Sequence, residues 1–211
     1  MANEELREEN YNKALLAAIE LFSEFGVEHT DMTQIAKKAG VSRRSVFRYF
    51  GTKDDLVLET IQWGREKFSE AITKLVNSTE YQNKNGCEQM MMLYRTILQI
   101  AIDYCLYYVN CSLIEAYAVQ HSDKPFMRQY ECGCQEVVCA ATSAKEKGLL
   151  DGSINPVYKD DGYFYVHCMD FRGFFYRMAI YECSEKHASG LTSYEVMEHY
   201  MTTMENAVAA K

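Results

Sequence analysis

The basic residues of this protein gather in one short stretch of the sequence. Between Met32 and Lys53 there are basic side chains but no acidic ones, although the whole chain carries a formal net charge of −8. Guanidinium groups form paired hydrogen bonds with guanine edges and phosphate oxygens, and lysine neutralises phosphate as a point charge. One basic window in an acidic chain therefore indicates a compact DNA-contacting surface. Its residues are Lys37, Lys38, Arg43, Arg44, Arg48 and Lys53.

Two short segments of helical period hold this window, one on each side of Ala39-Gly40-Val41. We expect helices at Asp31–Ala39 and Arg43–Phe50, because their apolar residues recur at helical spacing. Thr30 and Ser42 precede them, and hydroxyl residues at such positions cap helix N-termini. A short helix, a glycine turn and a second, basic helix together predict a helix-turn-helix, whose second helix enters the DNA major groove.

The preceding segment, Glu4–Phe25, is expected to supply a third helix. Gly26 follows its last apolar residue and is expected to end it. A single helix cannot bury its own apolar stripe, so we predict a three-helix DNA-binding domain of residues 1–51. The stripe is Tyr11, Leu15, Ile19, Phe22 and Phe25.

The spacing of residues 25–56 also carries a family resemblance. The residues concerned are Phe25-Gly26-Val27, Thr30, Ile35-Ala36, Ala39-Gly40-Val41-Ser42, Phe47, Tyr49-Phe50, Lys53 and Leu56. Together they resemble the N-terminal signature of TetR-family transcriptional regulators. The rest of the chain is similar to that family only in its length and helical pattern.

The resemblance implies a set of DNA-contacting residues. In the family, the second helix of the pair reads the major groove, and a lysine just after a Tyr-Phe pair holds phosphate. Two positions depart from the family pattern: Phe47 stands where tyrosine is usual, and Arg44 where a small residue or lysine is common. The predicted contacts are Thr30, Thr33, Ser42, Arg43, Arg44, Ser45, Phe47, Arg48, Tyr49 and Lys53.

Residues 52–211 are predicted to form a second helical domain, so that the fold class is all-α. The resemblance implies that this helical bundle binds a small effector and forms a dimer. We expect a helix from Thr52 to about Asn77, which the resemblance implies moves on effector binding. A nearly continuous helix should follow from Cys87 to about Gln120, and another should end at Gly148.

The last two helices have the most regular apolar spacing in the chain. Their apolar residues step by three and four, which is typical of a helical packing seam. Two such seams on adjacent antiparallel helices can form a four-helix interface with a second copy, and the resemblance implies dimerisation at the same place. The alternative is that both seams pack within the chain itself. The seam residues are Phe164, Cys168, Phe171, Phe175, Met178, Met197, Met201, Met204 and Val208.

The predicted effector site draws on tyrosines, methionines and isolated polar groups of the second domain. Such residues line adaptable apolar pockets, although they also fill cores. Asp103 and His167 are polar groups in apolar surroundings and should need a partner or a ligand. The candidate lining residues are Met90, Tyr94, Asp103, Tyr104, Tyr108, Phe126, Tyr130, His167 and Phe171.

The eight cysteines leave a second kind of trigger open. Cys132, Cys134 and Cys139 are the nearest approach to a cluster, and they define the alternative of a redox- or metal-responsive DNA-binding regulator. The paired Cys and His spacings of zinc sites do not occur, so we predict neither a metal nor a cofactor.

Other classes of protein find little support in the sequence. No nucleophile elbow, phosphate-binding loop, zinc-protease or dinucleotide motif occurs, which leaves a helical enzyme as the least favoured alternative. The charged N-terminus and the interrupted apolar run Ile97–Ile114 predict a cytoplasmic protein without a membrane span. The sequence therefore predicts a homodimeric repressor that a small apolar or aromatic effector releases from a palindromic operator.

Overall fold

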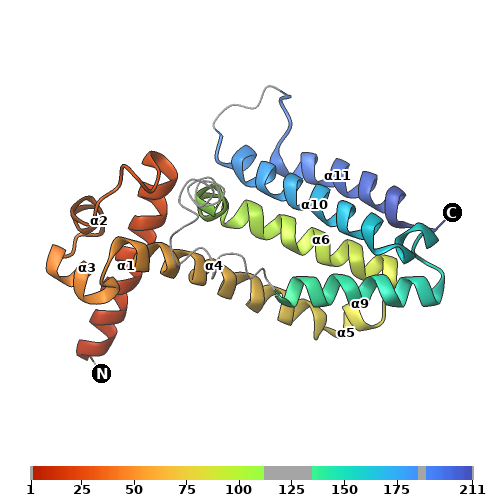
Figure 1. The fold of residues 1–211 in the computed structure, drawn as a ribbon, viewed down its shortest axis with the longest axis horizontal. Helices are drawn as coiled ribbons and strands as arrows, with labels where there is room; N and C mark the ends of the chain where they lie inside the picture. Colours follow the sequence, from red (N-terminus) through yellow and green to blue (C-terminus); the bar gives the residue numbers. More distant parts are fainter. Residues whose placement is uncertain (1, 112–134, 185–188, 211) are drawn as a thin grey trace. The chain divides into compact units, whose positions relative to one another are not determined.

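The computed structural model describes residues 2–111, 135–184 and 189–210, and these residues are almost entirely helical (Figure 1). No strand occurs in these ranges; a single isolated β-bridge joins Ile154 and Ala209. The prediction of an all-α protein is confirmed. The elements are α1 (Ala2–Phe25), α2 (Met32–Ala39), α3 (Arg43–Phe50), α4 (Lys53–Val76), α5 (Thr79–Gln82), α6 (Gly86–Asp103), α9 (Gln135–Asp151), the 3-10 helix η1 (Pro156–Lys159), α10 (Asp161–Glu182) and α11 (Ser193–Val208).

The chain divides into two compact units. The first contains residues 1–65 and 106–133, and the second contains residues 66–105 and 134–211. The division therefore falls within α4, between Arg65 and Glu66. The predicted domain boundary at residue 51 stays a prediction.

The core of the first unit joins α1, α2, α3 and the start of α4. Leu15 and Phe22 of the predicted α1 stripe are buried, together with Ile35 and Val46 from the helix pair. Phe25 was expected to belong to this stripe, but its side chain is 49% exposed. It is the last residue of α1, so no following helical turn covers its ring.

A glycine on α4 allows a close helix contact within the first unit. A Cβ atom placed on Gly64 would lie 1.8 Å from Cζ of Tyr107, so only glycine fits beneath that ring. The Tyr107 hydroxyl donates to the Ile61 carbonyl at 3.0 Å, and its ring lies 5.3 Å from that of Trp63. Tyr107 therefore fixes the segment after α6 onto α4.

The helix predicted from Cys87 to Gln120 is interrupted. It ends at Asp103, and Tyr104 leaves the helical conformation with φ −122° and ψ 37°. Residues 105–111 are helical again, and the remainder of the predicted segment lies outside the described residues. The apolar pattern continues across the break, so it does not reveal where α6 ends.

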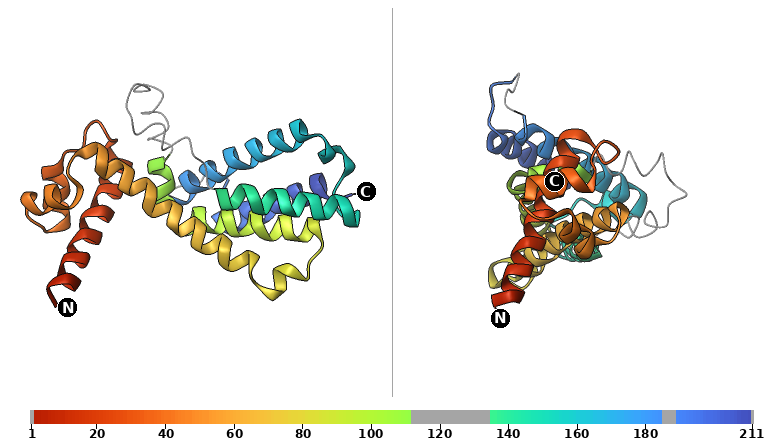
Figure 2. Two further views of the ribbon diagram at one scale, coloured as in Figure 1. Left: turned by 60° about the horizontal axis from the view of Figure 1, so that its bottom comes forward. Right: turned by 90° about the vertical axis from the view of Figure 1, so that its left-hand side faces the viewer.

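In the second unit, α6 lies alongside α9, α10 and α11 (Figures 1 and 2). Glycines permit the contact with α9, since a Cβ atom on Gly86 would lie 2.0 Å from the backbone nitrogen of Gly148. The prediction that Gly148 ends its helix is wrong, because α9 continues to Asp151. Gly148 serves close packing there instead of termination.

The predicted dimer seams lie in the interior of the second unit. Phe164 and Cys168 are half-buried, and the other seven residues are less than 10% exposed in the single chain. The seven buried residues are covered within the single chain, where α10 and α11 pack against α6, so they are not exposed to a second copy. The seven buried residues are Phe171, Phe175, Met178, Met197, Met201, Met204 and Val208.

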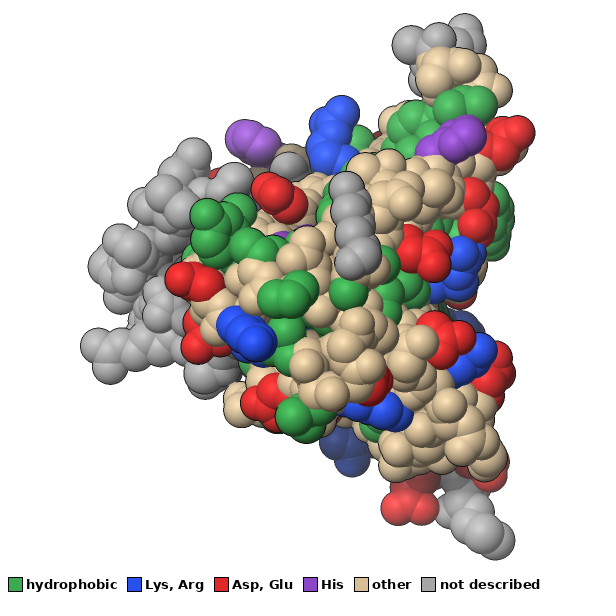
Figure 3. All heavy atoms as spheres, turned by 90° about the vertical axis from the view of Figure 1, so that its right-hand side faces the viewer, with side chains coloured by type: hydrophobic (Ala, Val, Ile, Leu, Met, Phe, Trp, Pro, Cys, Tyr) green, Lys and Arg blue, Asp and Glu red, His purple; other side chains and the backbone are tan. Residues whose placement is uncertain are grey.

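The surface of the second unit is mixed in character. On the face that Figure 3 shows, acidic and basic side chains are interspersed with apolar ones. Within the described ranges, no helix is both long enough and apolar enough to cross a bilayer.

Candidate DNA-binding site

Asp31, not Thr30, caps the first helix of the helix-turn-helix. Its carboxylate accepts hydrogen bonds from the backbone N–H groups of Thr33 (2.6 Å) and Gln34 (2.9 Å). The Gln34 side chain accepts in return from the Asp31 N–H at 2.7 Å, which completes a capping box. The bonds from the Gln34 and Thr33 N–H groups lower the pKa of Asp31. The start of α2 is therefore fixed by its own neighbours.

The predicted cap and DNA contact at Thr30 is wrong on both counts. Thr30 is 1% exposed, and its hydroxyl donates to the carbonyls of Gly26 (2.9 Å) and Leu21 (3.2 Å). A buried hydroxyl that is committed to two carbonyls cannot reach a phosphate. Its role is to hold the connection between α1 and α2 against the end of α1.

The turn between α2 and α3 sets the direction of the second helix. Gly40 has φ 67° and ψ 27°, a left-handed conformation that glycine adopts without steric cost. Ser42 then caps α3, since its hydroxyl oxygen accepts from the Ser45 N–H at 3.0 Å. Ser42 and Ser45 also share a hydrogen bond between their hydroxyls at 2.9 Å. Ser42 stays exposed, so it reaches the surface while it caps the helix.

Helix α3 turns its basic residues outward. Val46 and Phe50 are buried against the first unit, whereas the three arginines of the helix are exposed. Within the described residues, none of these guanidinium groups forms a salt bridge, whereas Lys38 on α2 pairs with Glu20 at 2.8 Å. The three guanidinium groups on α3 are therefore available to nucleic acid. They are Arg43, Arg44 and Arg48.

Aromatic rings hold two of these arginines. The Arg43 guanidinium lies 5.2 Å from the ring centre of Phe47, and Arg48 lies 5.2 Å from that of Tyr49. Such cation–π contacts restrict a flexible side chain without neutralising its charge. Phe47 lacks the hydroxyl usual in the family, but its exposed ring supports Arg43. The sequence shows these residues four apart, but only the helix geometry shows the contact.

Tyr49 joins the core to the exposed face of α3 that carries Arg43, Arg44 and Arg48, which we call the reading surface. Its ring lies 6.1 Å from those of Tyr11 and Phe50, and its hydroxyl accepts from the Arg48 guanidinium at 3.4 Å. Thr33 remains exposed on α2. Both hydroxyls are therefore placed at the surface, where backbone phosphates would lie.

Lys53 has a structural role that sequence reasoning missed. Its ammonium donates to the carbonyls of Val27 (2.8 Å) and Thr30 (3.2 Å). An ammonium has three N–H donors, so two are already used. Lys53 thus ties the start of α4 to the α1–α2 connection. No local sequence pattern predicts this contact, because the two partners lie 23 and 26 residues away in the chain.

The predicted effector residues are only partly brought together. Tyr94 stacks on Phe171 with ring centres 4.0 Å apart and lies 5.5 Å from the ring of His167. Met90 is also buried, on the same helix as Tyr94. These four residues belong to the interior of the second unit, as an effector site would require.

Of the other effector candidates, Asp103 and Tyr104 do not join this cluster. Asp103 and Tyr104 are exposed at the end of α6, where Asp103 accepts from the Gln99 amide at 2.8 Å. They were expected in the interior, but α6 ends there and turns them to the surface. Tyr108 belongs to the first unit. Phe126 and Tyr130 lie outside the described residues.

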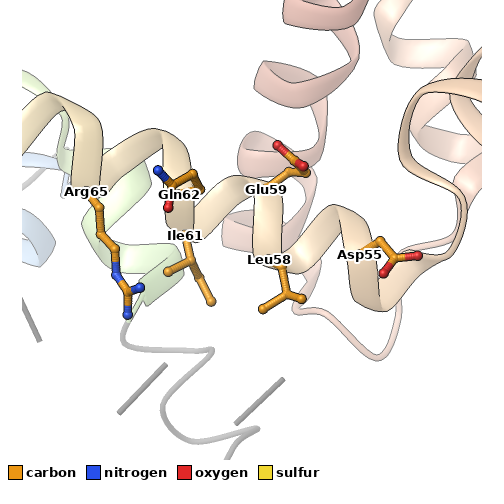
Figure 4. A pocket seen from close by; sticks show the side chains of 6 residues that line it. All are labelled: Asp55, Leu58, Glu59, Ile61, Gln62 and Arg65. Atoms are coloured by element: carbon orange, nitrogen blue, oxygen red, sulfur yellow. The ribbon is translucent and has the colours of Figure 1, made fainter. Parts of the chain in front are cut away.

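One hollow of about 270 Å³ follows α4 in the first unit (Figure 4). Leu58, Ile61 and Arg65 point to the same side of the helix. Its described lining residues all come from α4, namely Asp55, Leu58, Glu59, Ile61, Gln62 and Arg65.

The predicted cysteine cluster lies largely outside the described residues. Cys132 and Cys134 lie outside the described residues, and Cys139 is exposed. The structure instead places the thiols of Cys105 and Cys183 within hydrogen-bonding reach. Partial burial and that hydrogen bond raise the pKa of Cys183 to about 12, which opposes thiolate chemistry. No observation on the described residues favours the redox or metal alternative.

Residues 14–60, which contain the helix-turn-helix, match the model of bacterial regulatory proteins of the tetR family. This part of the chain is therefore similar to the DNA-binding part of tetR-family regulators. An 82-residue segment of the chain is 32% identical to the HTH-type transcriptional regulator HbdR of Aromatoleum sp. (strain CIB). That segment is 39% of this chain and spans only 36% of HbdR. The match supports the predicted resemblance over the helix-turn-helix, and the activity of the whole protein stays a prediction.

Solved structures share the fold over nearly the whole chain. The ketosteroid transcriptional regulator KstR2 of Mycobacterium tuberculosis has a TM-score of 0.74 over 95% of both chains, at 17% identity. A tetR-family regulatory protein from Rhodococcus RHA1 has a TM-score of 0.73, with 96% of this chain and 98% of that one covered, at 15% identity. The two-part helical architecture is therefore common to these proteins.

Proposed function

We propose that this tetR-family protein is a homodimeric transcriptional repressor that leaves its operator when a small molecule binds to its second unit. The observation that carries the proposal is the outer face of α3. It presents three exposed arginines without salt bridges in the described part of the chain, on a helix whose start is capped and whose inner face is buried. This is the arrangement that a major-groove helix requires.

The exposed residues divide the work of DNA recognition. Arg43, Arg44 and Arg48 carry groups that pair with guanine edges or phosphates. The hydroxyls of Thr33, Ser42, Ser45 and Tyr49 suit phosphate oxygens, which fix the register of the helix on the duplex. Phe47 contributes by supporting Arg43, and Lys53 by holding the domain together.

A genomic selection tests this proposal. Random fragments of the host genome are incubated with the full chain, and the retained fragments are sequenced. We expect a shared palindrome whose half-sites lie about one helical turn apart, roughly 34–36 Å, as a dimeric helix-turn-helix requires. Retention of fragments without any shared sequence would overturn sequence-specific binding.

We further propose that two copies associate through the outer face of α10. Val166 and Met169 are 58% and 40% exposed, Ile180 is 36% exposed, and Tyr165 is 65% exposed. These residues fall on one side of the helix, opposite the buried Phe171. Nothing lies within 4 Å of a Cβ atom built on Gly173, in the middle of this face, so a second helix could approach closely. The occupant is a second copy, because a palindrome needs two α3 helices.

The second unit is proposed as the effector domain. The buried cluster of Tyr94, His167 and Phe171 supports a site there. A related structure from Saccharomonospora viridis, with a TM-score of 0.70 and 14% identity over 97% of this chain, is described as a complex with choline. A ligand that binds the DNA-free arrangement more tightly would release the operator by that difference in affinity, typically about 1–3 kcal/mol.

A further inference from the structure

The interior of the second unit contains a cluster of hydrogen-bonding aromatic side chains. Tyr94 comes from α6, Tyr158 from η1, His167 from α10 and Tyr200 from α11. Tyr94 is 2% exposed, whereas Tyr158 and His167 are each 8% exposed. Four separate elements thus bring neutral polar groups into the core of one unit.

Ring contacts connect this cluster. The His167 ring lies 5.5 Å from that of Tyr94 and 5.3 Å from that of Tyr158. Phe171 stacks on Tyr94 at 4.0 Å and lies 6.3 Å from Tyr200. These flat surfaces suit an aromatic ring better than a branched aliphatic group.

Three polar atoms of the cluster lack partners. Nδ1 of His167 lies 3.4 Å from the Tyr158 hydroxyl. Among the described residues, Nε2 of His167 and the hydroxyls of Tyr94 and Tyr200 are buried without a hydrogen bond. Each such group costs about 1–3 kcal/mol of stability, and native proteins rarely leave it unpaired. Three of them in one cluster indicate a partner from outside the chain.

The electrostatics of the cluster disfavour a charged partner. Burial lowers the pKa of His167, although Asp170 opposes that effect. Burial also raises the pKa of Tyr94 and of Tyr158, and raises that of Tyr200 to about 12. All four groups are therefore uncharged near neutral pH. The ammonium group of Lys145 on α9 already pairs with Asp161 at 2.7 Å.

We propose that this cluster is the effector site and that it takes an uncharged hydroxyaryl molecule. The inference rests on the proposed effector function of the second unit. The ring of the ligand packs among Tyr94, His167 and Phe171, and its oxygens pair with the Tyr94 and Tyr200 hydroxyls and with His167 Nε2. A carboxylate should not bind, because no unpaired cation among the described residues of the cluster would offset the free-energy cost of removing its water.

Three matched small molecules test the ligand class by titration calorimetry with the full chain. Methyl 4-hydroxybenzoate is neutral and carries a phenol, 4-hydroxybenzoate carries a carboxylate in place of the methyl ester, and methyl benzoate lacks the hydroxyl. We expect the first to bind at least about tenfold more tightly than either of the others, which corresponds to about 1.4 kcal/mol. Equal binding of all three, or preference for the anion, would overturn the assignment.

Two variants test the site. Tyr94→Phe and His167→Phe keep an aromatic ring but remove the unpaired group, and each should weaken binding of methyl 4-hydroxybenzoate by about fivefold or more. Tyr163→Phe is the control, because Tyr163 is 62% exposed on α10, and it should bind like the wild type. Without ligand, Tyr94→Phe should be at least as stable as the wild type. A clear loss of stability would show that the hydroxyl is paired internally, and would refute the proposal.

Operator binding separates this inference from the proposed function. If the protein retains a palindromic operator but none of the three molecules binds, only the ligand class is wrong. If methyl 4-hydroxybenzoate binds as expected but no operator is found, the ligand assignment stands and the proposed repressor function is wrong.

Discussion

The reading surface on α3 and the aromatic cluster of the second unit arrange their polar groups in opposite ways. The reading surface exposes charged groups, and the contacts that shape it lie within residues 31–51. The cluster buries neutral groups that come from residues 94–200, and several of them are unpaired in the described structure. A surface assembled from a short window can be recognised from that window, whereas a site assembled from four distant elements cannot.

The same difference has an energetic side. An exposed arginine is solvated, so it costs little in the free protein and acts only when DNA binds. A buried hydroxyl without a partner reduces stability all the time. Substitutions of the exposed arginines should therefore change DNA binding without changing folding, whereas a charge introduced at a buried position of the second unit should lower stability.

The largest effect is expected from Met201→Glu. Met201 lies on the buried face of α11 and is 4% exposed. An unpaired carboxylate there should cost several kcal/mol of stability or prevent folding. Met169→Glu is the matched control, because Met169 is 40% exposed on α10. Circular dichroism should show lost helix only for the first variant. Equal behaviour of the two would mean that the inner and outer faces of α10 and α11 are wrongly assigned.

Val166→Glu should separate dimerisation from folding. It places a charge on the outer face of α10, so the protein should stay helical but become monomeric, and its operator affinity should fall by about 100-fold or more, since one half-site supplies too few contacts. Val138→Glu on α9 is the control, since Val138 is similarly exposed at 60%. Light scattering that shows an unchanged dimer for Val166→Glu would place the interface elsewhere.

Arg44→Ala should change DNA binding alone. Loss of a paired contact to a base costs about 1–3 kcal/mol, or roughly 5- to 150-fold in affinity, while the melting temperature should stay within about a degree or two of the wild type. Lys38→Ala serves as the comparison, because Lys38 is already paired with Glu20 and should have a smaller effect. Fluorescence anisotropy with labelled operator measures both. An unchanged affinity for Arg44→Ala would refute the assigned reading face.

Lys53→Ala tests whether the first unit also contains a cation whose role is purely structural. Loss of the bonds to Val27 and Thr30 should lower the free energy of unfolding by about 1–2 kcal/mol. The exposed Lys37 offers a control that should not affect stability. If Lys53→Ala instead left stability intact and reduced the salt dependence of DNA affinity by about one phosphate contact, Lys53 would act on DNA directly.

The smallest effect is expected from pH. Because burial lowers the pKa of His167 below its ordinary value of 6.5, the unfolded chain takes up a proton there more readily than the folded one. Stability should therefore be full above about pH 6.5 and fall as the pH drops below it. Urea unfolding of the wild type and of His167→Phe at several pH values from 7.5 to 5 isolates this contribution. A wild-type stability that rises on acidification relative to the variant would contradict it.

Sequence analysis predicted the first unit well because its signals are local. The left-handed Gly40, the Ser42 cap and the outward arginines all follow from spacing within one or two helical turns. It failed at Thr30, since two adjacent polar residues could each cap α2 and only packing assigned Asp31 to that role. It also missed Lys53, whose partners are distant in sequence.

The second unit was predicted only as an apolar helical bundle. Helix α10 is apolar on both its inner face, with Phe171 and Phe175, and its outer face, with Val166 and Met169. Periodicity alone cannot tell which side a neighbour covers. The residues of the predicted dimer seam therefore lie mostly in the interior of the second unit. The proposed dimer interface is the opposite, exposed side of α10.

The amino-acid sequence by itself determined that this protein carries a helix-turn-helix with a basic outer face, because caps, turn and charge lie within a few residues of one another. Tertiary structure alone decided which hydroxyls are buried, which face of α10 is open, and that Tyr94, Tyr158, His167 and Tyr200 meet. The physical reason is that burial and hydrogen-bond partnership depend on elements far apart in the chain, and no local pattern records which of them pack together.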